Sequence, residues 1–210
     1  MKILFQDNSI IVCVKPRGVL SQQAGEGQDS MIQKLSGLCD CEVFPVHRLD
    51  KEVGGVMVYA KTKAAAASLS AQVSQRIMQK AYLAVAPSSA KYTEGSMEDL
   101  LFFDRQKNKS FVVRRERRGV KKALLEYKSE KTCSDFSLYY IKLHTGRTHQ
   151  IRVQFASRKL PLLGDRKYGG EANDCIALWS YEIEFNHPVT GERLTFCEKP
   201  YDECFTAFDK

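Results

Sequence analysis

The segment His47-Arg48-Leu49-Asp50 places a basic and an acidic side chain two positions apart, with an apolar residue between them. On an extended or tightly turned backbone, residues two apart share a face, so Arg48 and Asp50 can point into one pocket while the leucine anchors the segment in the core. The glycine pair Gly54-Gly55 then permits a bend, and Val56-Met57-Val58-Tyr59-Ala60 predicts a buried strand. Taken alone, these residues fit a reactive loop held by a strand, and they equally fit an exposed ion pair at a turn.

Four other segments carry motifs in a fixed order: Lys15-Pro16-Arg17-Gly18, Gln79-Lys80-Ala81-Tyr82-Leu83-Ala84-Val85, Thr145-Gly146-Arg147-Thr148-His149-Gln150-Ile151-Arg152-Val153, and PLLGDRKYG at 161–169. Together with HRLD at 47–50, they make the chain resemble the RluA-type pseudouridine synthases over most of its length. The resemblance implies an α+β fold with a mixed, mostly antiparallel β-sheet, flanking helices and a central cleft. One departure lies beside the centre, where Val53-Gly54-Gly55 stands in place of the family's usual Thr-Ser-Gly and removes two hydroxyl groups.

The family's activity is the isomerisation of uridine to pseudouridine in structured RNA, which needs no cofactor and no metal. By resemblance, Asp50 is the catalytic aspartate, Arg152 is the guanidinium beside it, and Tyr82 stacks on the target base and assists proton transfer. Arg48 corresponds to the arginine that enters the RNA and holds the nucleotide out of its stack. We expect the substrate-binding residues to be Arg48, Lys80, Ile151, Lys15, Arg147 and His149. Among these, Ile151 closes the pocket, and Lys15 supports it or touches phosphate.

Charge points to a polyanionic partner. The chain has a net charge of +7 and a pI near 9.0, and neutralising phosphates releases counterions. Residues 105–122 (RQKNKSFVVRRERRGVKK) hold nine lysines and arginines against one glutamate. The apolar Phe111-Val112-Val113 interrupts them, which predicts a basic hairpin suited to RNA, although such hairpins also suit acidic proteins. The RNA-binding residues expected here are Arg105, Lys107, Arg114, Arg115, Arg117 and Arg118.

The seven cysteines are odd in number and scattered, and the N-terminus is too short and too polar for a signal peptide. Reduced thiols in a cytoplasmic protein are the simplest expectation. Cys39-Asp40-Cys41 could join His47 in a metal site, but a zinc site usually shows two clear ligand pairs. No window approaches the roughly 18 apolar residues of a membrane span.

The apolar patterns predict strands at 10–14, 56–60, 79–87, 123–131, 136–143, 176–185 and 194–197, and helices at 31–38, 63–75 and 148–159. We expect Met31, Leu35 and Leu38 to share the buried face of the first helix. The glycines at 23–28 indicate a flexible loop, since the phosphate-loop pattern is incomplete.

No repeat or linker interrupts the chain, so we expect a single domain over residues 1–210, and a monomer. The first motif begins at Lys15, which leaves no room for the RNA-binding domain that precedes many relatives. Two alternatives to the enzyme stay open. One is a non-catalytic RNA-binding module that retains the fold, favoured by the missing Thr-Ser pair. The other is a hydrolase with His47, Asp50, His144 and His149 around a metal.

Overall fold

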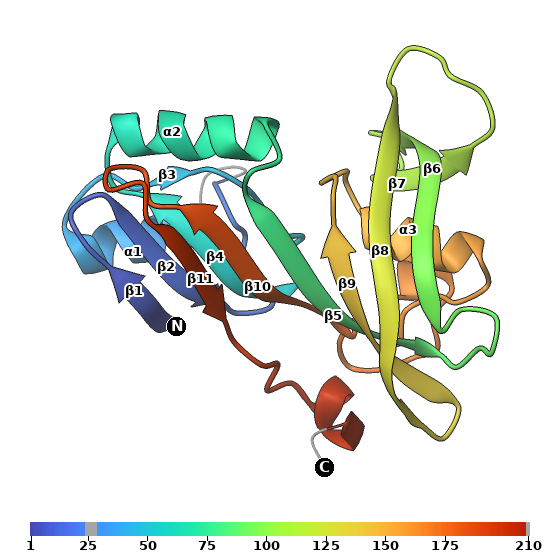
Figure 1. Ribbon diagram of the computed structural model, residues 1–210. Coiled ribbons are helices and arrows are strands. Elements are labelled where there is room, and N and C mark those ends of the chain that lie inside the picture. The colour runs from blue at the N-terminus through green and yellow to red at the C-terminus, as the bar shows by residue number, and fades with distance from the viewer. Residues whose placement is uncertain (24–28, 209–210) are drawn as a thin grey trace. The chain divides into compact units, whose positions relative to one another are not determined.

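The computed structural model describes residues 1–23 and 29–208 (Figure 1). The predicted loop at 23–28 lies, apart from its first residue, outside the described part. The chain forms two compact units: the first is Met1–Lys80 with Ser180–Pro200, and the second is Ala81–Trp179 with Tyr201–Lys210. Strands β5 (Gln79–Pro87) and β10 (Leu178–Asn186) contain residues of both units. The single domain stays a prediction.

The first unit is built on β4 (Gly54–Ala60), which is buried along its whole length. Its antiparallel neighbours are β2 (Ile10–Lys15), which pairs in turn with β1 (Lys2–Gln6), and the short β3 (Phe44–Pro45). Strand β11 (Arg193–Cys197) pairs antiparallel with β10. The strands predicted at 10–14, 56–60 and 194–197 are therefore confirmed, and β1 is added to them.

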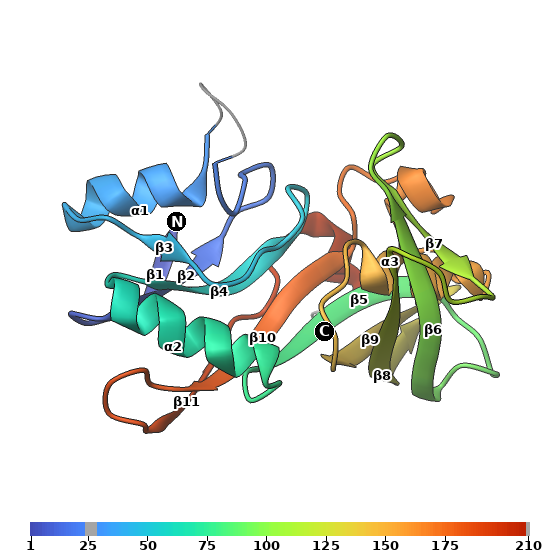
Figure 2. The same ribbon diagram turned by 90° about the horizontal axis from the view of Figure 1, so that it is seen from above.

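Two helices cover this sheet on opposite sides of β2 and β4, as Figure 2 shows. Helix α2 (Lys63–Ser74) begins after Thr62, whose side chain accepts a hydrogen bond from the amide of Ala65, 3.1 Å away, as a good N-cap does. Its Leu69 is completely buried in a cluster with Ile10, Val12, Val56, Val58 and Ile183. Burial of this apolar face holds the helix on the sheet.

Helix α1 (Met31–Cys39) begins after Ser30, its N-cap. Met31 and Leu35 are fully buried as expected, but Leu38 is 57% exposed. The expectation for Leu38 was wrong because the helix ends at Cys39, and its last turn has no core beneath it.

The second unit is an antiparallel sheet in the order β5-β9-β8-β6-β7. Its strands after β5 are β6 (Glu94–Asp104), β7 (Lys109–Val113), β8 (Val120–Cys133) and β9 (Phe136–Leu143). Helix α3 (Gln150–Ser157) packs on β6 and β7, and Tyr127, Tyr139 and Phe155 form edge-to-face ring contacts in the core. Two short 3-10 turns, η1 (Arg166–Tyr168) and η2 (Glu203–Phe208), complete the unit.

One strand and several boundaries differ from the predicted ones. Strand β6 was not predicted, because it begins with the polar residues Glu94-Gly95-Ser96. Strand β8 starts at Val120, three residues early, because its basic residues pair with β6. The helix predicted from Thr148 starts at Gln150, since His149 adopts a left-handed backbone with φ of 54°.

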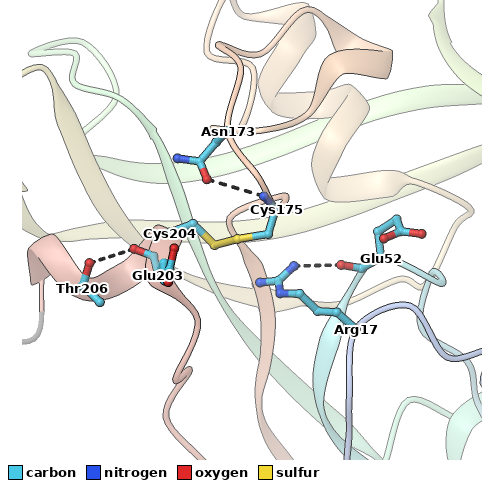
Figure 3. Close-up of a disulfide and its surroundings, with 7 residues drawn as sticks. All are labelled: Arg17, Glu52, Asn173, Cys175, Glu203, Cys204 and Thr206. Atoms are coloured by element: carbon cyan, nitrogen blue, oxygen red, sulfur yellow. Dashed lines mark hydrogen bonds between the residues drawn. A yellow bond between two sulfur atoms is a disulfide. The ribbon is translucent and has the colours of Figure 1, made fainter.

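A disulfide joins Cys175 to Cys204 (Figure 3). Reduced thiols were expected throughout, so for this pair the expectation was wrong. The two residues lie 29 positions apart in the sequence with Cα atoms 6.5 Å apart, a separation that allows a bridge. The tertiary fold brings them together, and their spacing in the sequence gives no hint of it.

Candidate active site

Asp50 lies in the loop that connects β3 to β4. Lys15, the last residue of β2, binds the backbone of this loop. The Lys15 side chain is completely buried, and its ammonium donates to the carbonyls of Pro16 (3.0 Å), Val19 (2.7 Å) and Lys51 (3.0 Å). Burial lowers the pKa of Lys15 to about 8, against the opposing influence of nearby Glu52. Lys15 therefore supports the loop beside Asp50, and a direct substrate contact by Lys15 stays a prediction.

Further contacts fix the same loop at both ends. The Arg17 guanidinium donates to the carbonyl of Glu52 at 2.7 Å (Figure 3), and the amide of Gly18 donates to the carbonyl of Lys51 at 2.9 Å. The hydroxyl of Ser21 both accepts from the amide of Leu49 and donates to its carbonyl, each at 2.9 Å. The first motif and the residues after it thus clamp the backbone on both sides of Asp50, which fixes the position from which its side chain projects.

The two residues before Leu49 differ in environment. The ring of His47 accepts a hydrogen bond at Nε2 from the amide of Val58, 3.2 Å away. Burial, assisted by the charge of Lys80, holds the pKa of His47 well below its usual value, so the ring is neutral. Arg48 is exposed. The apolar Leu49 is buried, as the sequence predicted.

The residues that replace the family's Thr-Ser-Gly pack tightly. Val53 is 2% exposed, and its amide donates to the carbonyl of Asp50 at 3.1 Å. Gly55 has φ of 121°, and a Cβ atom built there would lie 2.2 Å from the carbonyl oxygen of Ser180. A side chain at this position would collide with the backbone of β10, so the last glycine of the pattern is required sterically.

In the second unit, Arg152 of α3 forms a buried, two-pronged ion pair with Asp165. Nε and Nη2 of the guanidinium lie 2.7 Å and 2.8 Å from the two carboxylate oxygens, and neither side chain is more than 6% exposed. The ring of Tyr168 lies 5.3 Å from the guanidinium carbon. Asp165 was not among the predicted site residues, although it falls in the PLLGDRKYG segment. The pairing of Arg152 with Asp50 stays a prediction.

A side-chain network holds the turn before α3. The Gln150 side chain accepts from the hydroxyl of Thr145 (2.8 Å) and the amide of Arg147 (3.0 Å), and it donates to the carbonyl of Leu124 (3.1 Å). The Arg147 guanidinium donates to the carbonyl of Lys122 at 2.9 Å. Gln150 was missed as a functional residue, although it lies inside the third motif.

His149, Ile151 and Tyr82 are all buried, between 4% and 8% exposed. The Nδ1 atom of His149 lies 3.0 Å from the hydroxyl of Tyr168, which also binds the backbone of Ser110. Burial raises the pKa of Tyr168 to about 12. Tyr82 lies on β5 opposite Ile141 of β9. Direct substrate contacts by these three predicted residues stay predictions.

The basic segment at 105–122 contains two loops, one on each side of β7. Strand β7 pairs antiparallel with β6 across the first loop, which confirms the predicted hairpin for this part of the segment. The turn at 105–108 carries Arg105 and Lys107, and the loop at 114–119 carries the other arginines. The Arg117 guanidinium lies 4.8 Å from the ring centre of Phe102. All six of the predicted RNA-binding side chains are exposed: Arg105, Lys107, Arg114, Arg115, Arg117 and Arg118.

Over residues 1–23 and 29–208, no helix has the length and apolarity needed to cross a membrane. Within the same residues, no three side chains of His, Cys, Asp or Glu gather in a group that could hold a metal ion.

The family described as RNA pseudouridylate synthase matches residues 9–157, which include the HRLD loop, Tyr82 and Arg152. The chain belongs to this family. It is therefore an RNA pseudouridine synthase, an isomerase, as the five motifs predicted. The sequence matches to its relatives cover nearly the whole chain. It is 32% identical to the uncharacterized RNA pseudouridine synthase YhcT of Bacillus subtilis, covering 96% of this chain and 68% of that protein.

A second relative, an uncharacterized RNA pseudouridine synthase of Aquifex aeolicus, is 35% identical over 93% of this chain and 68% of its own length. Ribosomal large subunit pseudouridine synthase D of Vibrio cholerae is 33% identical over 93% of this chain and 66% of its own length. Among solved structures, human RNA pseudouridylate synthase domain containing 1 superposes with a TM-score of 0.80 at 20% identity, covering 97% of this chain and 86% of that one. This likeness confirms the pseudouridine synthase fold and the α+β class.

Proposed function

We propose that this synthase converts uridine to pseudouridine in ribosomal or transfer RNA, with Asp50 as the catalytic carboxylate. Large-subunit ribosomal RNA is the first candidate, because relatives from Vibrio cholerae and Neisseria meningitidis are named ribosomal large subunit pseudouridine synthase D. The observation that carries the proposal is the clamped HRLD loop. Lys15, Arg17 and Ser21 bind its backbone on both sides of Asp50, and such support is what a catalytic carboxylate needs to keep a fixed position.

The reaction breaks the bond between ribose C1′ and base N1, turns the base, and forms a bond from C1′ to C5. The proton on C5 leaves, and N1 gains a proton, so the atoms balance without an oxidant or a cofactor. Asp50 begins this sequence as the nucleophile or base. Tyr82, with a flat ring on β5, stacks on the uracil and assists the proton transfer.

The other residues of the proposed site bind and position. Arg152 supplies a positive charge beside the reacting carboxylate, and the two-pronged contact with Asp165 fixes the plane of its guanidinium. Arg48, exposed next to Asp50, enters the RNA as the uridine leaves its stack. The loops at 105–108 and 114–119 bind phosphates of the same RNA through their exposed arginines and lysines.

The test is a map of pseudouridines in ribosomal and transfer RNA from cells with the gene, without it, and with only the Asp50→Asn form. We expect one or more uridines to be converted to pseudouridine when the wild-type gene is present. The same uridines should stay unmodified in cells without the gene and in cells with only Asp50→Asn. Unchanged maps in all three strains would refute the proposal. RNA that copurifies with the protein while the maps stay unchanged would favour the non-catalytic RNA-binding module.

A further inference from the structure

The imidazole of His47 carries a buried donor that has no acceptor. The amide of Val58 is an obligatory donor and points at Nε2, so that nitrogen holds a lone pair. Because the ring is neutral, its proton sits on Nδ1. In the part of the chain that the structure describes, Nδ1 is buried and has no hydrogen-bond partner. A buried N–H without an acceptor costs free energy, so it calls for an explanation.

Lys80 lies close to this ring. Met78, two residues before it, packs in the same apolar cluster as Val46, the residue before His47. His47 and Lys80 therefore both follow segments that contact one apolar cluster of the first unit. The charge of Lys80 also acts directly on the imidazole.

The ammonium of Lys80 has no carboxylate or carbonyl partner among the described residues. Its side chain is partly buried, and burial lowers its pKa to about 8. Lys15 of the same unit differs from Lys80, because its buried ammonium donates hydrogen bonds to three backbone carbonyls. The Lys80 ammonium and Nδ1–H of His47 are thus two donors without an acceptor among the described residues, and His47 lies three residues before Asp50 in the sequence.

We propose that Lys80 and His47 form a binding site for a phosphate group of the RNA substrate, beside the HRLD loop. The ammonium of Lys80 meets the phosphate from the side that solvent reaches, and Nδ1–H of His47 supplies the second donor from the buried side. Arg48, exposed and adjacent in sequence, extends the positive surface. This site would hold the backbone next to the uridine that reaches Asp50, so the inference rests on the proposed function.

The first test observes the His47 ring by ¹⁵N NMR while inorganic phosphate is added at constant ionic strength, with chloride as the balancing salt. In the free protein we expect Nδ1 to be protonated and Nε2 to be unprotonated. Added phosphate should change the chemical shift of Nδ1 in a saturable way. Lys80→Met should abolish this shift, and Lys80→Arg should restore it. A Nδ1 signal that does not respond to phosphate would overturn the site.

The second test separates RNA from free phosphate. Affinity for a transcript of large-subunit ribosomal RNA is measured against salt concentration for wild type, Lys80→Met and Lys63→Met. Lys63 is exposed at the start of α2 and makes a matched control for charge. Loss of one phosphate contact should lower the slope of log affinity against log salt by about 0.7 to 0.9 in Lys80→Met, and Lys63→Met should keep the wild-type slope.

Equal slopes for Lys80→Met and wild type would overturn the assignment to RNA, even if inorganic phosphate binds. Product formation is followed in the same preparations. A wild-type protein that makes no pseudouridine contradicts the proposed function, whereas the NMR shift and the salt slope still report on the phosphate site. The two failures can therefore be told apart.

Discussion

Asp50 and Arg152 are held in different ways. The loop of Asp50 is fixed through its backbone, by side chains of Lys15, Arg17 and Ser21 that bind carbonyls and an amide. The guanidinium of Arg152 is fixed through its own charge, by a carboxylate that is completely buried. The supporting residues lie up to 36 positions before the loop in the first region, and the carboxylate lies 13 positions after the arginine in the second.

The difference has an energetic consequence. The backbone of the Asp50 loop is held by several hydrogen bonds, each of which contributes about 1 kcal/mol to the free energy of unfolding. In a buried ion pair the stabilisation comes from a single contact. Loss of one partner of such a pair leaves an uncompensated charge in the core. We therefore expect the Arg152 region to fail abruptly on mutation and the Asp50 loop to loosen by degrees.

The largest effect should follow Asp165→Asn, which removes the buried carboxylate charge that contacts two nitrogens of the Arg152 guanidinium. We expect the free energy of unfolding to fall by about 3 to 5 kcal/mol, measured by urea denaturation. The control is Glu184→Gln, which removes the charge that pairs with Arg193 where the two side chains are 30% and 34% exposed; its loss should be about 1 kcal/mol or less. Equal losses in the two variants would remove the contrast drawn between the regions.

Lys15 offers a pH test of the backbone clamp. Burial lowers its pKa from 10.5 to about 8 in the folded protein, so between these pH values the unfolded chain binds more protons than the folded one. The stability of wild type relative to Lys15→Met should therefore rise with pH from about 8 to about 10.5, by roughly 3 kcal/mol in total. Below pH 8 the full cost of burying the charge is present.

Urea denaturation of both proteins at a series of pH values measures this difference. Lys63→Met, which removes an exposed lysine, should show no such rise relative to wild type. A wild-type to Lys15→Met difference that stays constant from pH 7 to 10 would contradict a buried, desolvated ammonium under the Asp50 loop.

The smallest effect should follow Ser21→Ala. It removes the hydroxyl that binds both the amide and the carbonyl of Leu49, and we expect a loss of about 1 to 2 kcal/mol in the free energy of unfolding. Because the loop stays attached through Lys15 and Arg17, product formation should slow without disappearing. A complete loss of activity in a folded Ser21→Ala protein would mean that the clamp is not shared among its members.

The sequence predicted the elements whose signals are local. Strand β4 reads as an apolar run, and α2 follows a capping threonine with a run of alanines, so both were found without knowledge of the fold. Strand β6 was missed because polar residues begin it, and it is stabilised by pairing with β7 and β8. The left-handed turn at His149 and the Cys175–Cys204 bridge likewise depend on tertiary contacts.

The candidate site shows the same division. The HRLD and third motifs pointed to Asp50 and Arg152 through family resemblance, and Lys15 was expected to support the pocket. Asp165 was overlooked because a carboxylate thirteen positions from an arginine has no spacing that signals a pair. Such a contact arises only when the loop after α3 folds back on the helix.

The central claim is that Asp50 carries out the isomerisation, and single-turnover kinetics test it most directly. Purified wild type, Asp50→Asn and Glu52→Gln are mixed in excess with a ribosomal RNA transcript that contains a site identified by the cellular map. We predict that wild type and Glu52→Gln form pseudouridine at that site, and that Asp50→Asn forms none while binding the transcript with an affinity close to wild type. Pseudouridine formed by folded Asp50→Asn at the wild-type rate would contradict the account.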